Sequence, residues 1–248
     1  EYLDLSFDDA WRLDPQRIVA ALRPETRLVS LTYPHNPTGA MLTRDELDAI
    51  VQAVEAHDSA TLLLDETYRD FLADESAPHD LFAEENWQNF LVSLYSFSKS
   101  YCIPGHRLGA ITGGVPLIQQ VAKVMDNLQI CAPRPAQAAV AKAIPALADW
   151  RDDNRLEIER RADALRQVMP KISGWDLVSV GAYFAFIRHP FRGVSSAAVS
   201  EQLAKRAGVV CLPGVYFGEG QEDYLRFAFA NADVETIAKL ESRLSGFT

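Results

Sequence analysis

Short apolar runs alternate with amphipathic stretches along the first 150 residues of this chain. The apolar runs cover residues 27–33, 61–64, 90–95 and 108–112, and each is nearly continuous. Strands that are buried on both faces have this composition, whereas a strand with one wet face alternates apolar and polar side chains. The pattern therefore predicts an α/β fold, with a mainly parallel sheet sandwiched by helices.

The stretches between these runs have the spacing of amphipathic helices. We expect helices over residues 43–57, 116–128, 135–147 and, longest, 149–169. Thr43 stands at the start of the first, and Glu46 follows three residues later, as in a capping box. These signals predict that helix 43–57 begins at Thr43.

The pattern changes after about residue 174. Residues 183–187 and 224–229 read as strands, and residues 195–207 and 234–244 read as helices. This mixture predicts a smaller α+β domain at the C-terminus. We expect residues 1–150 to form a large domain, and residues 151–248 to form a linking helix and the small C-terminal domain.

Charge and cysteine content exclude several classes of function. The net charge is −10 with no basic run, so we expect this segment to make no nucleic-acid contact. The chain has three cysteines without a C-x-x-C pair and five histidines without ligand spacing, which predicts no metal site and a reducing, cytoplasmic location. No apolar run reaches the roughly 18 residues that span a membrane.

Asp65 is the first candidate for a ligand-binding residue. It directly follows the apolar run 61–64, and ligands of open α/β sheets lie beyond the carboxyl ends of the strands. A carboxylate there could meet a cationic ligand group, and Tyr68, three residues later, could face the same pocket. The alternative is that Asp65 caps a loop or pairs with Arg69. Another candidate, the Asn-Pro-Thr-Gly sequence at residues 36–39, read alone is a turn.

Hydroxyl, amine and guanidinium groups come together after the run 90–95. Residues 96–99 read Ser-Phe-Ser-Lys, and residues 105–109 read Gly-His-Arg-Leu-Gly. Glycines let a backbone approach a ligand closely, and an arginine can hold a phosphate with two parallel hydrogen bonds. The segment therefore fits a site for a phosphorylated aldehyde, although a lysine at a strand end is ordinarily a solvated cation.

Arg226 lies inside the apolar strand 224–229. Burying a guanidinium is costly unless an anion meets it, which suggests a ligand carboxylate. The alternative is an outward-facing arginine on an edge strand.

In this order, N-P-T-G, D-x-x-Y, S-x-S-K, G-x-R-x-G and the final L-R-F-A-F-A resemble the class I/II aminotransferases. These are fold-type I enzymes that depend on pyridoxal 5′-phosphate (PLP). The resemblance implies a PLP-transferase large domain, in which Lys99 is the catalytic Schiff-base lysine. It also implies roles for other residues: Asp65 at the pyridine nitrogen, Tyr68 and Asn36 at the phenolic oxygen, Ser96, Arg107 and Ser98 at the phosphate, and Arg226 at the substrate carboxylate.

The same resemblance implies amino-group transfer between an L-amino acid and a 2-oxo acid by a homodimer. It further implies that roughly the first third of a typical family member does not appear in this sequence. Three alternatives stay open: a PLP lyase of the same fold that performs C–S β-elimination, a PLP-sensing regulatory domain of a transcription factor, and an α/β protein without cofactor. Arg134 could contact a second substrate carboxylate or be a surface residue.

Overall fold

The computed structural model describes residues 13–57, 59–73 and 77–247. These residues form two compact units. The first comprises Leu13–Pro34 and Met41–Asp153, and the second comprises His35–Ala40 and residues 154–247. The predicted division at residue 150 stays a prediction, and each unit is described by itself.

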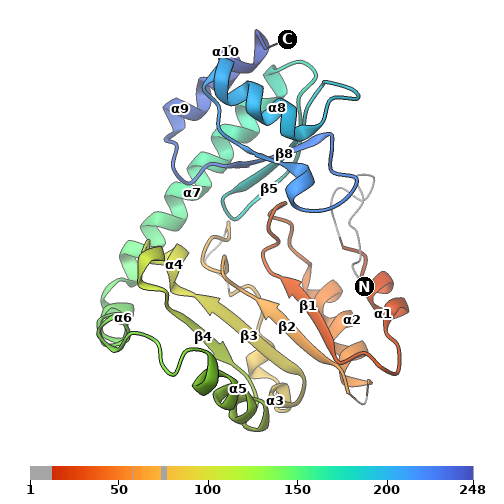
Figure 1. Cartoon of the computed structure of the whole chain (residues 1–248), viewed down its shortest axis with the longest axis vertical. Helices are drawn as coiled ribbons and strands as arrows, with labels where there is room; N and C mark the ends of the chain where they lie inside the picture. The colour runs from red at the N-terminus through yellow and green to blue at the C-terminus, as the bar shows by residue number, and fades with distance from the viewer. Residues whose placement is uncertain (1–12, 58, 74–76, 248) are drawn as a thin grey trace. The chain divides into compact units, whose positions relative to one another are not determined.

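The first unit alternates strands and helices (Figure 1). Its elements are, in chain order, α1 (Pro15–Ala21), β1 (Leu28–Thr32), α2 (Arg44–Glu55), β2 (Thr61–Asp65), η1 (Leu81–Ala83), α3 (Trp87–Phe90), β3 (Leu91–Ser96), α4 (Phe97–Ser100), η2 (Pro104–His106), β4 (Gly109–Thr112), α5 (Val115–Leu128) and α6 (Arg134–Ala146). The long helix α7 (Ala148–Val168) begins in this unit and continues into the second.

The sheet of the first unit has the order β1-β2-β3-β4. Strands β1, β2 and β3 are parallel to one another, while β4 is antiparallel to β3. The hairpin of β3 and β4 is close enough that a Cβ on Gly109 would stand 2.8 Å from the carbonyl oxygen of Tyr95. The predicted α/β class with a mainly parallel sheet is confirmed.

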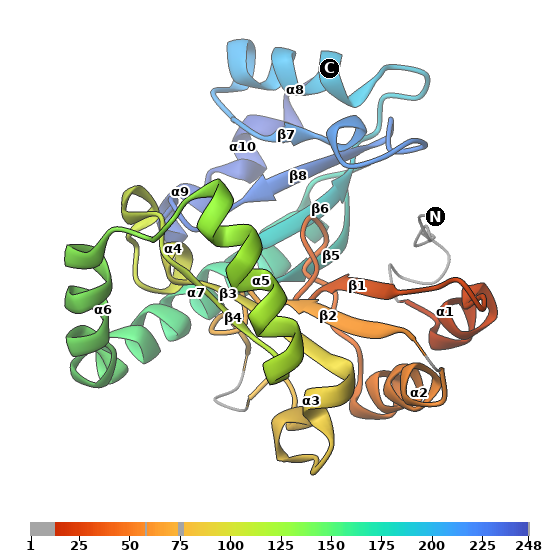
Figure 2. The same ribbon diagram turned by 60° about the horizontal axis from the view of Figure 1, so that its bottom comes forward.

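Apolar side chains of β1–β3 and of α1, α2 and α3 make the core of this unit. Figure 2 shows the ribbons of α2 and α3 beside these strands. The start of helix α2 is fixed by hydrogen bonds between residues that are neighbours in the sequence. Thr43 accepts a hydrogen bond from the backbone N of Glu46, and the Glu46 carboxylate accepts one from the backbone N of Thr43. The predicted capping box is therefore confirmed. Four apolar residues of α2 then face the core: Leu47, Ile50, Val51 and Val54.

The second unit contains shorter elements. After α7 these are η3 (Met169–Lys171), β5 (Asp176–Gly181), β6 (Phe184–Arg188), α8 (Ser196–Gln202), the π-helical turn η4 (Leu203–Ala207), β7 (Leu212–Pro213), η5 (Gly214–Tyr216), β8 (Tyr224–Ala228), α9 (Val234–Ala238) and α10 (Leu240–Ser245). The sheet order is β5-β6-β8-β7, and all neighbours are antiparallel. The predicted small α+β domain is confirmed.

The segment His35–Ala40 belongs to the second unit, although the chain reaches it between β1 and α2. Ser179 of β5 donates a hydrogen bond from Oγ to the carbonyl oxygen of Thr38 at 2.8 Å. Gly39, at φ +73°, is so close to Gly181 that a Cβ on Gly39 would stand 2.4 Å from the Gly181 nitrogen. Only glycine tolerates both this dihedral and this approach. The Asn-Pro-Thr-Gly turn is thus docked on the edge strand β5.

Among the described residues, no helix combines the length and apolarity that crossing a bilayer requires.

Candidate functional site

Asp65 lies at the C-terminal end of β2, at the same sheet edge as the end of β3. The two strands are parallel neighbours, and Asp65 pairs with Leu94 in their register. One oxygen of the half-buried carboxylate, Oδ1, accepts hydrogen bonds from the backbone N of Thr67 at 3.1 Å and from its Oγ1 at 2.7 Å. In the described part of the chain, Oδ2 has no partner. Topology therefore leaves one carboxylate oxygen open at the edge where ligands of such sheets bind.

Lys99 lies one turn beyond the end of β3, within α4. Ser96 caps this short helix, because its Oγ accepts a hydrogen bond from the backbone N of Ser98 at 3.3 Å. Ser98 is buried and Lys99 is half-buried. No other described residue forms an ion pair or a hydrogen bond with the Lys99 amine. A half-buried amine that no anion neutralises is suited to react with a carbonyl group.

Arg107 is exposed in the connection between α4 and β4. Its backbone is left-handed, with φ 51°, and its Nη1 donates to the carbonyl oxygen of Pro104 at 2.8 Å. The hairpin register pairs Ser96 with Gly109, so Arg107 follows the same hairpin back toward the end of β3. Ser96, Lys99 and Arg107 therefore belong to one continuous strand–helix–strand segment.

Tyr68 lies in the turn that follows β2 and is buried, with 8% of its surface exposed. This turn begins with a hydrogen bond from Arg69 N to the Glu66 carbonyl oxygen at 3.0 Å. The alternative that Asp65 pairs with Arg69 is wrong, since Arg69 Nη1 lies 3.2 Å from Glu66 Oε1. The bond from Thr67 shows that Asp65 does cap the turn.

Asn36 and Arg226 meet within the second unit. Arg226 Nη1 donates to Asn36 Oδ1 at 2.7 Å across 190 positions of sequence. The guanidinium carbon lies 4.6 Å from the ring centroid of Phe184 and 4.8 Å from that of Phe217. The alternative of an edge-strand arginine is wrong, because β8 lies between β6 and β7. Two rings and an amide thus hold a half-buried planar cation, as recognition of a carboxylate requires.

Two clusters of polar residues were not predicted from the sequence. Glu66, next to Asp65, is fully buried, and Ser93, His79 and Arg69 surround its carboxylate. Burial by itself would raise the pKa of Glu66, but hydrogen bonds from His79 and Ser93 outweigh it and hold the pKa below the usual range. The sequence does carry a signal for this burial. Successive side chains of a strand point to opposite faces, so one of two adjacent acidic residues must point toward the core.

The second cluster connects β3 with the start of α7. Tyr95 Oη donates to Asp70 Oδ2 at 2.5 Å, and Arg151 Nη1 lies 3.6 Å from Asp70 Oδ1. Arg151 also donates to Tyr101 Oη at 3.4 Å. Burial, followed by the hydrogen bond to Asp70, raises the pKa of Tyr95. No local pattern in the sequence predicts these long-range contacts.

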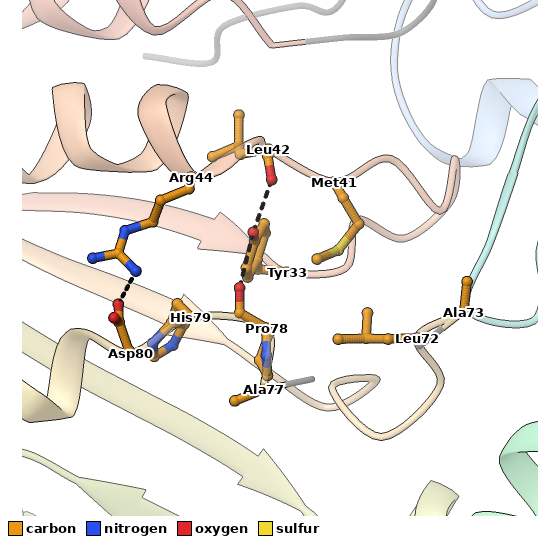
Figure 3. A pocket seen from close by; sticks show the side chains of 10 residues that line it. All are labelled: Tyr33, Met41, Leu42, Arg44, Leu72, Ala73, Ala77, Pro78, His79 and Asp80. Atoms are coloured by element: carbon orange, nitrogen blue, oxygen red, sulfur yellow. Dashed lines mark hydrogen bonds and ion pairs between the residues drawn. The ribbon is translucent and has the colours of Figure 1, made fainter. Parts of the chain in front are cut away.

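A hollow of about 540 Å³ opens elsewhere in the first unit (Figure 3). Tyr33 lies at its centre, and its Oη donates to the carbonyl oxygens of Leu42 and Pro78. Arg44 and Asp80 form an ion pair on one side. None of the predicted site residues lines this hollow. Arg134, at the start of α6, is exposed and also lies outside it.

Comparison with known proteins identifies the family. Residues 2–244 match the family described as aminotransferase class I and II. The chain belongs to this family. An aromatic-amino-acid aminotransferase of Thermococcus litoralis is 28% identical over 91% of the chain and 58% of its own length. An aspartate aminotransferase of Sulfolobus acidocaldarius is 27% identical over 97% of the chain and 60% of its own length.

Solved structures of aminotransferases have the same fold. The aromatic aminotransferase of Pyrococcus horikoshii has a TM-score of 0.85 at 27% identity, over 96% of this chain and 64% of that one. The N-succinyldiaminopimelate aminotransferase of Mycobacterium tuberculosis has a TM-score of 0.82 at 28% identity, over 94% and 61%. This aminotransferase chain thus spans about 60% of the length of the relatives it matches.

Class I and II aminotransferases depend on PLP, so membership of the family assigns this cofactor. The donor set of the first unit fits such a group. Among the residues that the structure describes, one oxygen of Asp65 is free to accept from a protonated pyridine nitrogen, and the Lys99 amine is free to meet an aldehyde. Ser96 and Arg107 bring a hydroxyl and a guanidinium, which bind phosphate.

Proposed function

We propose that the complete protein transfers an amino group between an L-amino acid and a 2-oxo acid, using PLP bound to Lys99. The observation that carries this proposal is the position of Asp65 and Lys99 at the ends of two parallel neighbouring strands. Both groups lack a protein partner for the relevant atom among the described residues. The relatives named above are aminotransferases, which favours amino transfer over β-elimination and over a regulatory role.

In this proposal, the residues of the first unit hold and tune the cofactor. When bound, PLP supplies an electron sink for the negative charge that develops at the substrate Cα. The Asp65 carboxylate keeps the pyridine nitrogen protonated, and Thr67 fixes the orientation of that carboxylate. Ser96, Ser98 and Arg107 bind the phosphate. Tyr68 donates to the phenolic oxygen, together with Asn36 of the second unit.

Lys99 has two tasks in this proposal. Its amine would hold the aldehyde carbon of the cofactor covalently. Once released, the same amine would act as a general base that removes a proton from the substrate Cα, and then as the general acid that gives the proton back. A lysine is suited to this work where it is half-buried and free of a carboxylate partner, as Lys99 is among the described residues.

Arg226 binds the substrate α-carboxylate in this proposal. The hydrogen bond to Asn36 and the rings of Phe184 and Phe217 fix the plane of the guanidinium. A fixed guanidinium can donate hydrogen bonds to both carboxylate oxygens, which orients the Cα–H bond for removal of its proton.

The test uses full-length protein incubated with PLP. We expect a visible absorption band, and reduction with borohydride followed by peptide mapping should place the label on Lys99. The variant Lys99→Ala should lose the band and lower amino transfer to 2-oxoglutarate by at least about a thousandfold, because both the covalent bond and the proton carrier are removed. Lys123→Ala, on the exposed part of α5, is the control. A label on another lysine would overturn the assignment.

We also propose that the complete protein is a cytoplasmic homodimer. The three cysteines, Cys102, Cys131 and Cys211, are free thiols, which is typical of a reducing compartment. Large apolar side chains are exposed on α5, Val124 and Leu128 among them, and a partner surface would bury them. Light scattering of the full-length protein measures its mass in solution, and a monomer would contradict the proposal.

A further inference from the structure

A buried carboxylate lies directly beside the proposed cofactor site. Glu66 follows Asp65 in the chain, and its side chain is fully buried. Leu62, Leu64 and Glu66 share the side of β2 that faces the core, whereas Asp65 points to the opposite side. The two neighbouring carboxylates therefore have different surroundings: Asp65 faces the site, and Glu66 lies beneath it.

Three side chains compensate the charge of Glu66. Ser93 Oγ donates to Glu66 Oε2 through a short hydrogen bond. Arg69 Nη1 and His79 Nε2 each lie 3.2 Å from Oε1. His79 Nδ1 accepts a hydrogen bond from Leu81 N, which leaves the proton on Nε2, toward the carboxylate. An isolated carboxylate would be very costly to bury, so the fold keeps Glu66 only together with these partners.

The Glu66–Ser93 contact joins the end of β2 to the middle of β3. Ser93 lies on β3, where it pairs with Leu64, and the Glu66 backbone N donates to the Leu94 carbonyl oxygen at 2.8 Å. That backbone bond continues the β2–β3 ladder just beyond its last pair, after which the chain turns away. The side-chain bond therefore ties the end of β2, which carries Asp65, to β3, the strand that leads to Lys99.

We propose that Glu66, through its bond to Ser93, is a positioning residue that fixes the spacing between Asp65 and Lys99. The inference rests on the proposed function, because it requires PLP to bridge these two residues. Glu66 itself lies on the far side of β2 and touches no part of the cofactor in this scheme. A tilt of one strand end relative to the other would carry the Lys99 amine away from an aldehyde that Asp65 has helped to orient. Misplacement of about 1 Å can slow a reaction by up to about a hundredfold.

The experiment measures how fast Lys99 attaches to bound PLP. Cofactor-free full-length protein is mixed with saturating PLP, and growth of the visible band gives a first-order rate constant. The variants are Ser93→Ala, which removes the linking hydroxyl, and Glu66→Gln, which keeps the shape without the charge. Val54→Ala truncates a buried side chain of the same core on α2, away from the strand ends, and is matched to the variants by its loss of thermal stability.

We expect Ser93→Ala and Glu66→Gln to slow attachment roughly tenfold relative to Val54→Ala. The double variant should be no slower than the slower single variant, because both changes break one linkage. In a Lys99→Ala background, Ser93→Ala should no longer weaken PLP binding more than Val54→Ala does. Rates within about twofold of the Val54→Ala value would overturn the inference. Failure of the unmodified protein to attach PLP at Lys99 would instead refute the proposed function.

Discussion

The two groups of predicted site residues depend on different physical devices. In the first unit, Asp65 and Lys99 share a sheet edge because they follow parallel neighbouring strands. In the second unit, Arg226 lies on an inner strand of an antiparallel sheet, where Asn36 and two aromatic rings surround it. Strand order brings Asp65 and Lys99 to one sheet edge although no hydrogen bond or ion pair joins them among the described residues. The Arg226 guanidinium is instead held by direct contacts with the protein.

The two regions should therefore tolerate different substitutions. Residues at the parallel edge keep an open atom for a ligand, so their substitution should affect the ligand more than the fold. The Arg226 guanidinium should contribute both to ligand binding and to the fold, because the acceptor and the aromatic rings that it contacts belong to the protein.

Arg226→Lys should lower kcat/KM for amino acids by roughly a hundredfold, or about 3 kcal/mol. Lysine keeps the charge but loses the planar two-pronged contact and the rings' preference for a guanidinium. Steady-state kinetics of the full-length protein measures the effect. The visible band with PLP should still form, since Lys99, to which the cofactor attaches in the proposed function, belongs to the first unit. Loss of the band in Arg226→Lys would contradict the proposal that the first unit holds the cofactor while Arg226 binds the substrate.

His35→Asn should remove part of the acid sensitivity of the second unit. Burial lowers the pKa of His35 to about 4, so the folded ring stays neutral while the unfolded ring, with pKa 6.5, takes up a proton. The free energy of unfolding therefore decreases as the pH falls from about 6.5 to 4. Because some water reaches the His35 ring, we expect a decrease of about 2 kcal/mol. Asparagine can still contact Thr38, which lies 2.8 Å from His35 Nδ1.

Denaturant unfolding at pH 7, 5.5 and 4.5 measures this effect. The unmodified protein should lose more stability than His35→Asn over this range, and equal losses would contradict the prediction. The matched control is His57→Asn, in the bend that follows α2. The loss of stability of His57→Asn between pH 7 and 4.5 should equal that of the unmodified protein.

Tyr95→Phe should destabilise the first unit by about 1–2 kcal/mol. The change leaves Asp70 without its hydrogen bond at 2.5 Å, and the Asp70 side chain is only 16% exposed. Thermal unfolding measures the loss. Tyr216→Phe, in the second unit, removes a hydroxyl from a side chain that is 71% exposed and should change stability by less than about 0.5 kcal/mol. Equal effects would show that the Asp70 contact contributes nothing.

Local patterns in the sequence predicted most of the regular elements. The strands that became β1, β2, β3, β4, β6 and β8 were identified to within about two residues, as was the capping box of α2. The strand β5 was missed, because Asp176 and Gly181 blur its ends and a bulge between Leu177 and Ser179 interrupts its alternation. The helix expected over residues 195–207 ends as the π-helical turn η4 before Gly208, which is left-handed at φ 62°.

The site shows the same limit. Motifs identified Lys99, Asp65 and Arg226 as candidates, but neither the bond from Arg226 to Asn36 nor the burial of Glu66 with His79 was foreseen. Each of these contacts joins residues that lie far apart in the chain. Hydrophobic periodicity carries no information about such partners, since it describes only which side of an element faces the core.

Local sequence was enough to predict the alternation of strands and helices, the N-cap of α2, and the reactive groups at strand ends. Those features follow from backbone preferences and from the periods of 2 and 3.6 residues, which are local. The partners of the buried charges, and the placement of residues 35–40 in the second unit, are visible only in the folded chain. A buried charge needs a partner near it in space, and strand order, rather than sequence distance, decides which residue that is.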